Sequence, residues 1–168
     1  QVISMFDLII RHSRVIDGTG AESFTADVGI VGDMITAVGD LSGAESHDTI
    51  DLGASPPALH SPQSDGGTSD LILCPGFIDA HTHSDTYLLI EPSAPSKVYQ
   101  GITTEVCGNC GASGAPISDI SQLPSDWADK PYPGAWSSVA EFRDLFDHVR
   151  PAVNAVLLIG HNTLRRNV

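Results

Sequence analysis

The sequence predicts an α/β protein in which a small all-β portion is followed by alternating strands and helices. Three observations lead to this prediction. Residues 1–53 contain short apolar runs separated by Gly and Asp, residues 54–70 are rich in Ser, Pro and Gly, and residues 71–168 alternate between strand-like and helical segments. Polar side chains collect just after the apolar runs of this last part, as they do in α/β barrels. We therefore predict a β portion at 1–72 and a barrel portion at 73–168.

The β portion is predicted to hold four short strands. Gly32-Asp33 lies between two strand-like runs, as the tight turn of a β-hairpin does. Such a small sheet cannot bury both of its faces by itself. The segment 54–70 contains almost no core-forming side chains, and we expect it to be a flexible insertion. The expected strands lie at 6–10, 26–31, 34–38 and 49–52.

The barrel portion is predicted to contain three buried strands. Pro75-Gly76 interrupts the apolar run after the insertion, so the first strand begins after these residues. Ser138 and Glu141 form a capping box, a Ser followed by Glu three residues later, which opens an amphipathic helix that ends at Pro151. The expected strands lie at 77–81, 103–107 and 154–159.

The composition limits the partners of the chain. Its 168 residues are 41% hydrophobic and 17% charged, with a formal net charge of -13. Phosphate binding needs clustered Lys and Arg, so this acidity argues against nucleic acid and anionic membranes as partners. No stretch reaches the ~18 unbroken apolar residues of a membrane helix, and the first residues lack a signal-peptide pattern, so we expect a cytoplasmic protein. Three cysteines in such a chain argue against a disulfide framework.

The clearest chemical signal is His81-Thr82-His83. On a strand, residues i and i+2 project to the same face, so two imidazoles in this spacing can share one metal ion at about 2.0–2.1 Å. The pair follows an apolar strand, at the end where barrel enzymes keep their active sites. Taken alone, the pattern fits two solvent-facing histidines in a loop equally well.

The context of this pair resembles a known family. Pro75-Gly-Phe-Ile-Asp-Ala-His-Thr-His83 is similar to the first barrel strand of the amidohydrolase superfamily. The resemblance implies an α/β fold, the N-terminal part of a small β-sandwich followed by the first strands of a (β/α)8 TIM barrel, apparently incomplete. Segments 6–10, 15–18 and 33–39 are similar to the N-terminal half of the superfamily's β-sandwich, and 101–113, 136–142 and 159–165 resemble its N-acyl-D-amino-acid deacylase (D-aminoacylase) group.

Cys110 is the residue that separates this group from other amidohydrolases. In most members a carboxylated lysine bridges two metals, whereas the D-aminoacylase group uses a Cys in Gly-Asn-Cys-Gly, and Gly108-Asn-Cys-Gly111 stands in that place. A thiolate is a good zinc ligand at about 2.3 Å, and coordination would deprotonate the thiol. A buried packing cysteine is one alternative. A redox pair with Cys107 is another, although such a pair should open a helix and this Gly-rich segment does not. We expect Cys107 to be a buried strand residue.

Four further residues are candidates for supporting the metal site or the substrate. Asp79 and Asp85 flank the histidine pair, and either could accept a hydrogen bond from a ligand imidazole and fix its tautomer. A solvated or turn carboxylate is the alternative for each. Asn109 lies beside Cys110 in the same loop, and His161 follows the third strand at the same barrel mouth, which makes it a substrate-pocket candidate.

The resemblance implies a zinc-dependent hydrolase, with one or two divalent ions, that cleaves small N-acyl-D-amino acids to a carboxylate and a D-amino acid. The alternatives are an amidohydrolase of the dihydroorotase, hydantoinase or dipeptidase type, or an inactive truncated homologue that acts as a binding module. A complete barrel takes ~250 residues, and the family's general base and remaining histidine ligands belong to later strands. We therefore expect the base beyond Val168, and no activity from these 168 residues alone.

Overall fold

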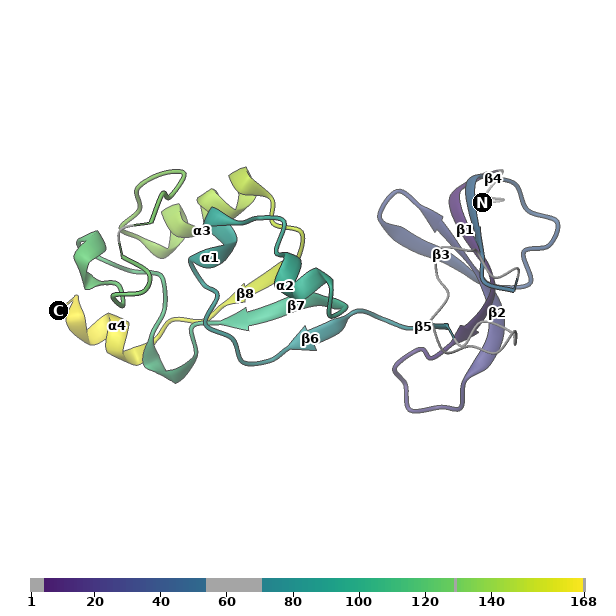
Figure 1. Cartoon of the computed structure of the whole chain (residues 1–168), viewed down its shortest axis with the longest axis horizontal. Coiled ribbons are helices and arrows are strands. Elements are labelled where there is room, and N and C mark those ends of the chain that lie inside the picture. Colours follow the sequence, from purple (N-terminus) through teal and green to yellow (C-terminus); the bar gives the residue numbers. More distant parts are fainter. Residues whose placement is uncertain (1–4, 54–70, 129, 168) are drawn as a thin grey trace. The chain divides into compact units, whose positions relative to one another are not determined.

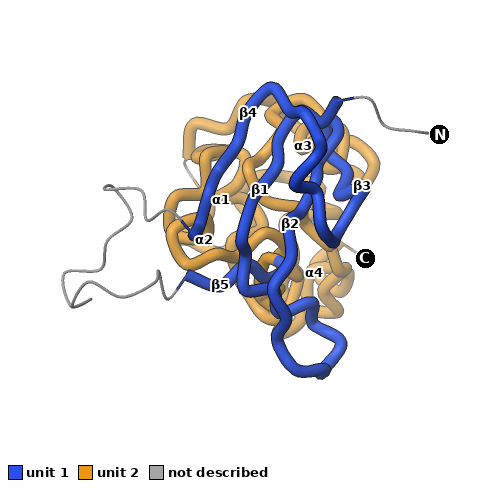
Figure 2. The backbone as a smooth tube through the Cα atoms, turned by 90° about the vertical axis from the view of Figure 1, so that its right-hand side faces the viewer, with its two compact units in different colours: residues 1–75 blue, residues 76–168 orange. Residues whose placement is uncertain are grey.

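The computed structural model describes residues 5–53, 71–128 and 130–167. The chain divides into two compact units, residues 1–75 and residues 76–168, and each is described by itself (Figure 2). Each unit contains a sheet, and helices occur in the second, so the predicted α/β class is confirmed (Figure 1). The finer assignment of 1–72 to a β-sandwich and 73–168 to a barrel stays a prediction, and the predicted insertion at 54–70 lies outside the described residues.

The first unit is a sheet built around its longest strand, β1. The strand order is β3-β2-β1-β4, and β5 also pairs with β1. The β1–β2 and β2–β3 pairs are antiparallel, with the predicted turn between β2 and β3, whereas β4 and β5 run parallel to β1. The strands are β1 (Phe6–Val15), β2 (Phe24–Val31), β3 (Met34–Gly39), β4 (Ser46–Asp51) and β5 (Ile72–Leu73).

The core of the first unit lies along β1. Phe6, Ile9 and Val15 of this strand and Val28 of β2 are buried. Gly29 leaves room for the Phe6 ring, because a Cβ at this position would lie 2.6 Å from a ring carbon. This close packing helps to fix the register of β1 against β2, since a shift by one residue would turn Phe6 to the other face.

The second unit is a parallel sheet with the order β6-β7-β8. Because the strands are parallel, their carboxyl ends meet at one edge of the sheet, where ligand sites of α/β proteins are found. Among the described residues, no helix combines the length and apolar character needed to cross a membrane. The elements are β6 (Phe77–Asp79), α1 (Tyr87–Ile90), α2 (Pro95–Val98), β7 (Ile102–Cys107), the 3-10 helices η2 (Asn109–Gly111) and η3 (Ile120–Gln122), α3 (Val139–Val149), β8 (Asn154–Leu157) and α4 (His161–Arg166).

Two of these strands are shorter than predicted, and the difference matters for the site. β6 ends at Asp79 and not at His81, while β8 ends at Leu157 and not at residue 159. Beyond these ends, pairing with β7 is reduced to single backbone bonds: Thr82 N donates to Val106 O at 3.1 Å, and Leu158 N donates to Cys107 O at 3.0 Å. The residues after Asp79 therefore belong to a loop at the strand-end edge.

Helix α3 has the predicted start and covers the sheet with aromatic side chains. Ser138 Oγ accepts a hydrogen bond from Glu141 N at 3.2 Å, and a Glu141 carboxylate oxygen accepts from Ser138 N at 3.0 Å, so the capping box is confirmed. Phe142 and Phe146 are buried in the core of this unit. The Phe142 ring lies 5.1 Å from that of Trp136 and 5.2 Å from that of Phe146, a spacing typical of favourable aromatic pairs.

Candidate metal centre

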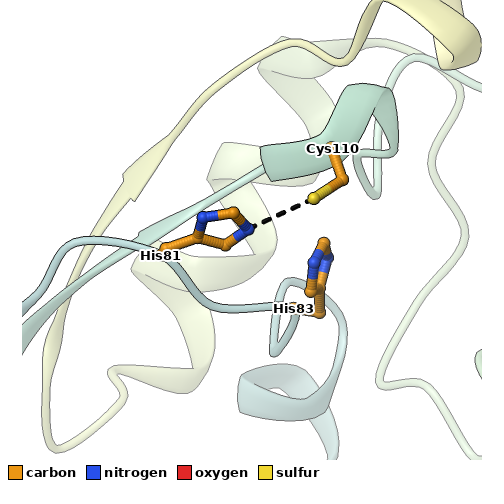
Figure 3. A group of neighbouring side chains, drawn as sticks. All are labelled: His81, His83 and Cys110. Atoms are coloured by element: carbon orange, nitrogen blue, oxygen red, sulfur yellow. Dashed lines mark hydrogen bonds between the residues drawn. The ribbon is translucent and has the colours of Figure 1, made fainter.

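His81, His83 and Cys110 come together at the strand-end edge of the second unit (Figure 3). One ligand atom from each lies within 4.8 Å of the others, and the three side chains are exposed. His81 Nε2 is 3.2 Å from Cys110 Sγ, and the two imidazole rings are 5.5 Å apart with an interplanar angle of 67°. Among the residues that the structure describes, this is the one cluster of three or more such side chains suited to a metal ion.

The geometry of the cluster fits a tetrahedral metal. Nitrogen and sulfur ligands of one zinc ion, at about 2.0–2.1 Å and 2.3 Å from it, lie roughly 3.5 Å apart. The 3.2 Å between His81 Nε2 and Cys110 Sγ is slightly shorter, as expected for two groups joined by a direct hydrogen bond. The three ligand atoms lie within 4.8 Å of one another, so rotation of the exposed side chains would be needed to bring two nitrogens and one sulfur to the distances of a single ion.

The loop after β6 holds the two histidines through its backbone. Asp79 Oδ1 accepts a hydrogen bond from His81 N at 3.3 Å, and the bond from Thr82 N to Val106 O ties the middle of the pair to β7. Asp79 is a candidate for a hydrogen bond to a ligand imidazole, with a solvated or turn carboxylate as the alternative. It contacts the His81 backbone instead, and its other oxygen accepts from Lys97 Nζ at 2.7 Å, which lowers the pKa of Asp79.

The position of Cys110 is set by an unusual backbone. Gly108, Cys110 and Gly111 all have positive φ, of 84°, 56° and 81°. A Cβ at Gly108 would lie 2.7 Å from the carbonyl carbon of Leu158, so only glycine lets this loop pack on the end of β8. Asn109 acts here as a loop anchor, because its side chain donates to Val106 O at 2.7 Å. The loop thereby directs the Cys110 thiol toward the histidines.

Cys107 is buried and is not part of the cluster of His81, His83 and Cys110. It is fully buried, and its thiol donates to Glu105 Oε1 at 3.2 Å. Burial, followed by the charges of Glu105 and Asp85, raises the pKa of Cys107 far above its usual range. The predicted role as a buried strand residue is confirmed, and these properties disfavour a redox pair with Cys110. A thiol with so high a pKa does not supply the thiolate that disulfide exchange requires.

The remaining two candidates, Asp85 and His161, differ in burial: Asp85 is buried and His161 is exposed. Asp85 is 1% exposed, so it is not a solvated carboxylate. Its Oδ2 accepts from Gly114 N at 3.3 Å while Oδ1 has no hydrogen-bond partner, and burial raises the pKa of this carboxyl. His161 is exposed at the start of α4 and is not part of the metal cluster. Its role as a substrate contact stays a prediction.

Two residues beside the site were not anticipated from the sequence. Glu105 is completely buried on β7, and Lys97 of α2 lies 3.3 Å from it. The signal for Glu105 was present, because a carboxylate within the apolar run Thr103–Cys107 has to be paired if the strand is buried. The partner could not be found in the same way, since Lys97 lies in a different element.

Comparison with known proteins identifies the relatives of the chain. No family model matches it. The chain is 38% identical over 164 residues to the D-aminoacylase of Alcaligenes xylosoxydans xylosoxydans, a match that covers 97% of this chain and 31% of the relative.

Two solved structures have the same fold over most of the chain. One, described with the binuclear metal centre of D-aminoacylase, is 35% identical with a TM-score of 0.72 and covers 95% of this chain and 31% of its own. The other is N-acyl-D-glutamate deacylase from Bordetella bronchiseptica with zinc and a phosphonate inhibitor. It is 32% identical with a TM-score of 0.77, and the match covers 95% of this chain and 30% of the deacylase chain. The chain thus spans about a third of the length of its relatives. By sequence and by fold, the chain is similar to an N-terminal portion of the D-aminoacylase group of the amidohydrolases.

Proposed function

We propose that this chain supplies the His81, His83 and Cys110 ligands of a zinc site in an enzyme that hydrolyses N-acyl-D-amino acids. The observation that carries the proposal is the cluster itself, with three ligand atoms within 4.8 Å of one another at the strand-end edge of a parallel sheet. The relatives named D-aminoacylase and N-acyl-D-glutamate deacylase support the substrate class. A small N-acyl-D-amino acid is the proposed substrate, and a carboxylate and a D-amino acid are the proposed products.

The chemistry of the donors favours zinc and requires particular protonation states. A divalent ion bound here would lower the pKa of a bound water and polarise the amide carbonyl of the substrate. To act as ligands, His81 and His83 must be neutral and Cys110 must be a thiolate. The exposed position of all three side chains lets their protons leave to solvent and leaves the ligand atoms open to a small molecule.

The remaining parts of the site belong to the longer enzyme in this proposal. We place the general base outside the 168 residues, as the resemblance implies, so the segment alone should bind metal but not turn over substrate. The two units are proposed as portions of a β-sandwich and of a (β/α)8 barrel. A second ion in the same centre is consistent with the binuclear centre described for D-aminoacylase.

Cobalt substitution tests the ligand set. Co²⁺ can replace zinc in such sites and reports on its own ligands: thiolate coordination gives a charge-transfer band in the near ultraviolet. We expect the protein that carries this chain to show that band, Cys110→Ser to lose it, and His81→Ala to bind Co²⁺ much more weakly. Cys74→Ser and His148→Ala change an exposed cysteine and an exposed histidine outside the cluster and should leave the spectrum unchanged.

The activity of the full-length protein provides the second readout. Hydrolysis of N-acetyl-D-amino acids should fall to background in Cys110→Ser and in His81→Ala while both control variants remain active. A Co²⁺ spectrum without the thiolate band in the unmodified protein would rule out Cys110 as a ligand. Metal binding without hydrolysis of any N-acyl-D-amino acid would leave the metal site intact but remove the proposed reaction.

A further inference from the structure

A largely buried polar cluster involves the loop that carries His81 and His83. Lys97 of α2 is only 14% exposed, and its Nζ contacts Asp79 Oδ2 at 2.7 Å, Thr82 Oγ1 at 2.8 Å and Glu105 Oε2 at 3.3 Å. An ammonium group has three donors, so each proton of Lys97 faces an oxygen. Burial opposes its charge, but the hydrogen bond with Asp79 and the charge of Glu105 outweigh this effect and raise the pKa of Lys97 above its usual value.

The cluster continues from Lys97 to the residue after the second ligand. Ser84 Oγ donates to the Glu105 carboxylate, at 3.0 Å from one oxygen and 3.1 Å from the other, and is 2.8 Å from Thr82 Oγ1. Asp79, Thr82 and Ser84 therefore all take part in one network. These three residues alternate with the ligands His81 and His83 along the loop, so the network holds the loop on both sides of each ligand.

We infer that Lys97 is a positioning residue for the metal site, acting through Asp79 and Thr82 to hold His81 and His83 toward Cys110. This inference rests on the metal site proposed above. The loop that carries the two histidines lies beyond the end of β6 and keeps only one backbone bond to β7, from Thr82 N to Val106 O. The contacts of Lys97 tie that same loop to both α2 and β7, which the single backbone bond cannot do.

Charge and positioning predict opposite effects when Lys97 is removed. The cluster contains one ammonium group and two carboxylates, so removing Lys97 makes the surroundings of the ion more negative. If Lys97 acted only through its charge, its loss would tighten cation binding. If Lys97 positions the ligands, its loss weakens binding in spite of the more favourable charge. The sign of the change in metal affinity therefore separates the two roles.

The experiment measures the dissociation constant of Co²⁺ against a competing chelator in the full-length protein. We expect Lys97→Met to raise this constant by about 10–100-fold, the usual cost of losing a partner that orients metal ligands. Lys130→Met is the matched control, because Lys130 is the only other lysine in the sequence and is exposed. It should leave the constant unchanged.

A second variant covers the case in which Lys97→Met does not fold, since it leaves Glu105 buried without its cation. Thr82→Val removes one hydroxyl contact of Lys97 at nearly constant volume and should still raise the constant several-fold. Thermal melting of the metal-free proteins identifies any variant that is unfolded. If Lys97→Met folds and binds Co²⁺ as tightly as the unmodified protein or more tightly, the inference about Lys97 is wrong but the metal site stands. If Lys97→Met is unfolded, the same result for Thr82→Val has the same meaning. Failure of the unmodified protein to bind Co²⁺ would overturn the metal site together with it.

Discussion

Replacing Gly160 with alanine should weaken metal binding, because the added methyl group displaces the loop that carries Cys110. Gly160 precedes α4 and has an ordinary backbone conformation, with φ -73° and ψ 132°, so alanine is allowed there by its own torsion angles. A Cβ at this position would lie 2.5 Å from the Gly111 carbonyl carbon and 2.7 Å from Ala112 N. Both atoms belong to the backbone of the Cys110 loop, so no side-chain rotation can relieve the overlap.

The size of the effect follows from these distances. Carbon atoms in contact are usually about 3.5 Å apart or more, so the Cys110 loop and the start of α4 must separate by roughly 1 Å. Such overpacking typically costs about 1–3 kcal/mol of stability. A metal ligand has to stay within about 0.2 Å of its ideal distance. We therefore expect at least about a tenfold loss of metal affinity, similar to the loss of a group that orients a ligand.

Two measurements on Gly160→Ala check this reasoning. Co²⁺ titration with the thiolate band as readout gives the affinity, and thermal melting of the metal-free protein gives the stability. Gly43→Ala is the matched control, because a Cβ at Gly43 would meet nothing within 4 Å. A Gly160→Ala protein with unchanged metal affinity and melting temperature would refute the claim that contact between Gly160 and Gly111 holds the Cys110 loop in place.

Two further predictions concern the titration and reactivity of single groups. Hydrogen bonds from Ser138 and Ser137 lower the pKa of Glu141 to about 2, so its stabilisation of α3 is complete above the ordinary Glu pKa of about 4.3 and is lost as the pH falls toward 2. The difference in melting temperature between the unmodified protein and Glu141→Gln should shrink over that window, and a difference independent of pH would contradict this. A thiol reagent should label the exposed Cys74 and Cys110 in the native protein and the buried Cys107 only after unfolding, with metal slowing the labelling of Cys110 alone. Peptide mass spectrometry measures the rates, and equally fast labelling of Cys107 and Cys110 would contradict the assignment.

Features that depend on neighbouring residues could be predicted from the sequence. The capping box depends on two residues of one helix start, Ser138 and Glu141. The strand predicted at 103–107 depends on one short run of residues, and the structure has it at Ile102–Cys107. The proximity of His81, His83 and Cys110 could also be predicted, although His83 and Cys110 are far apart in the chain, because the resemblance to a family supplied the contact that local patterns cannot. Whether these side chains bind a metal stays a prediction.

Features that depend on distant contacts were missed. β1 continues beyond Ile10 because Ser13 pairs with Ala26 of β2 after a register shift, and nothing in residues 11–15 alone indicates this. The burial of Asp85 also depends on a distant contact. Its sequence context fits a turn carboxylate, but the segment around Gly114 covers it and makes it a buried acid. The pairing of Lys97 with Glu105 likewise exists only once α2 packs on β7.

The backbone of Cys110 has a consequence for how this site can change during evolution. At φ 56° and ψ 21°, the residue adopts a left-handed conformation that costs an L-residue with a Cβ roughly 1–2 kcal/mol. Glycine would adopt it without that cost, and asparagine at a lower one. The residue needed for the thiolate is therefore not the residue that this backbone prefers, so stability and metal binding select for different amino acids at one position. If Cys110 is the metal ligand proposed above, a descendant that no longer needs the metal would gain stability by replacing this cysteine with glycine.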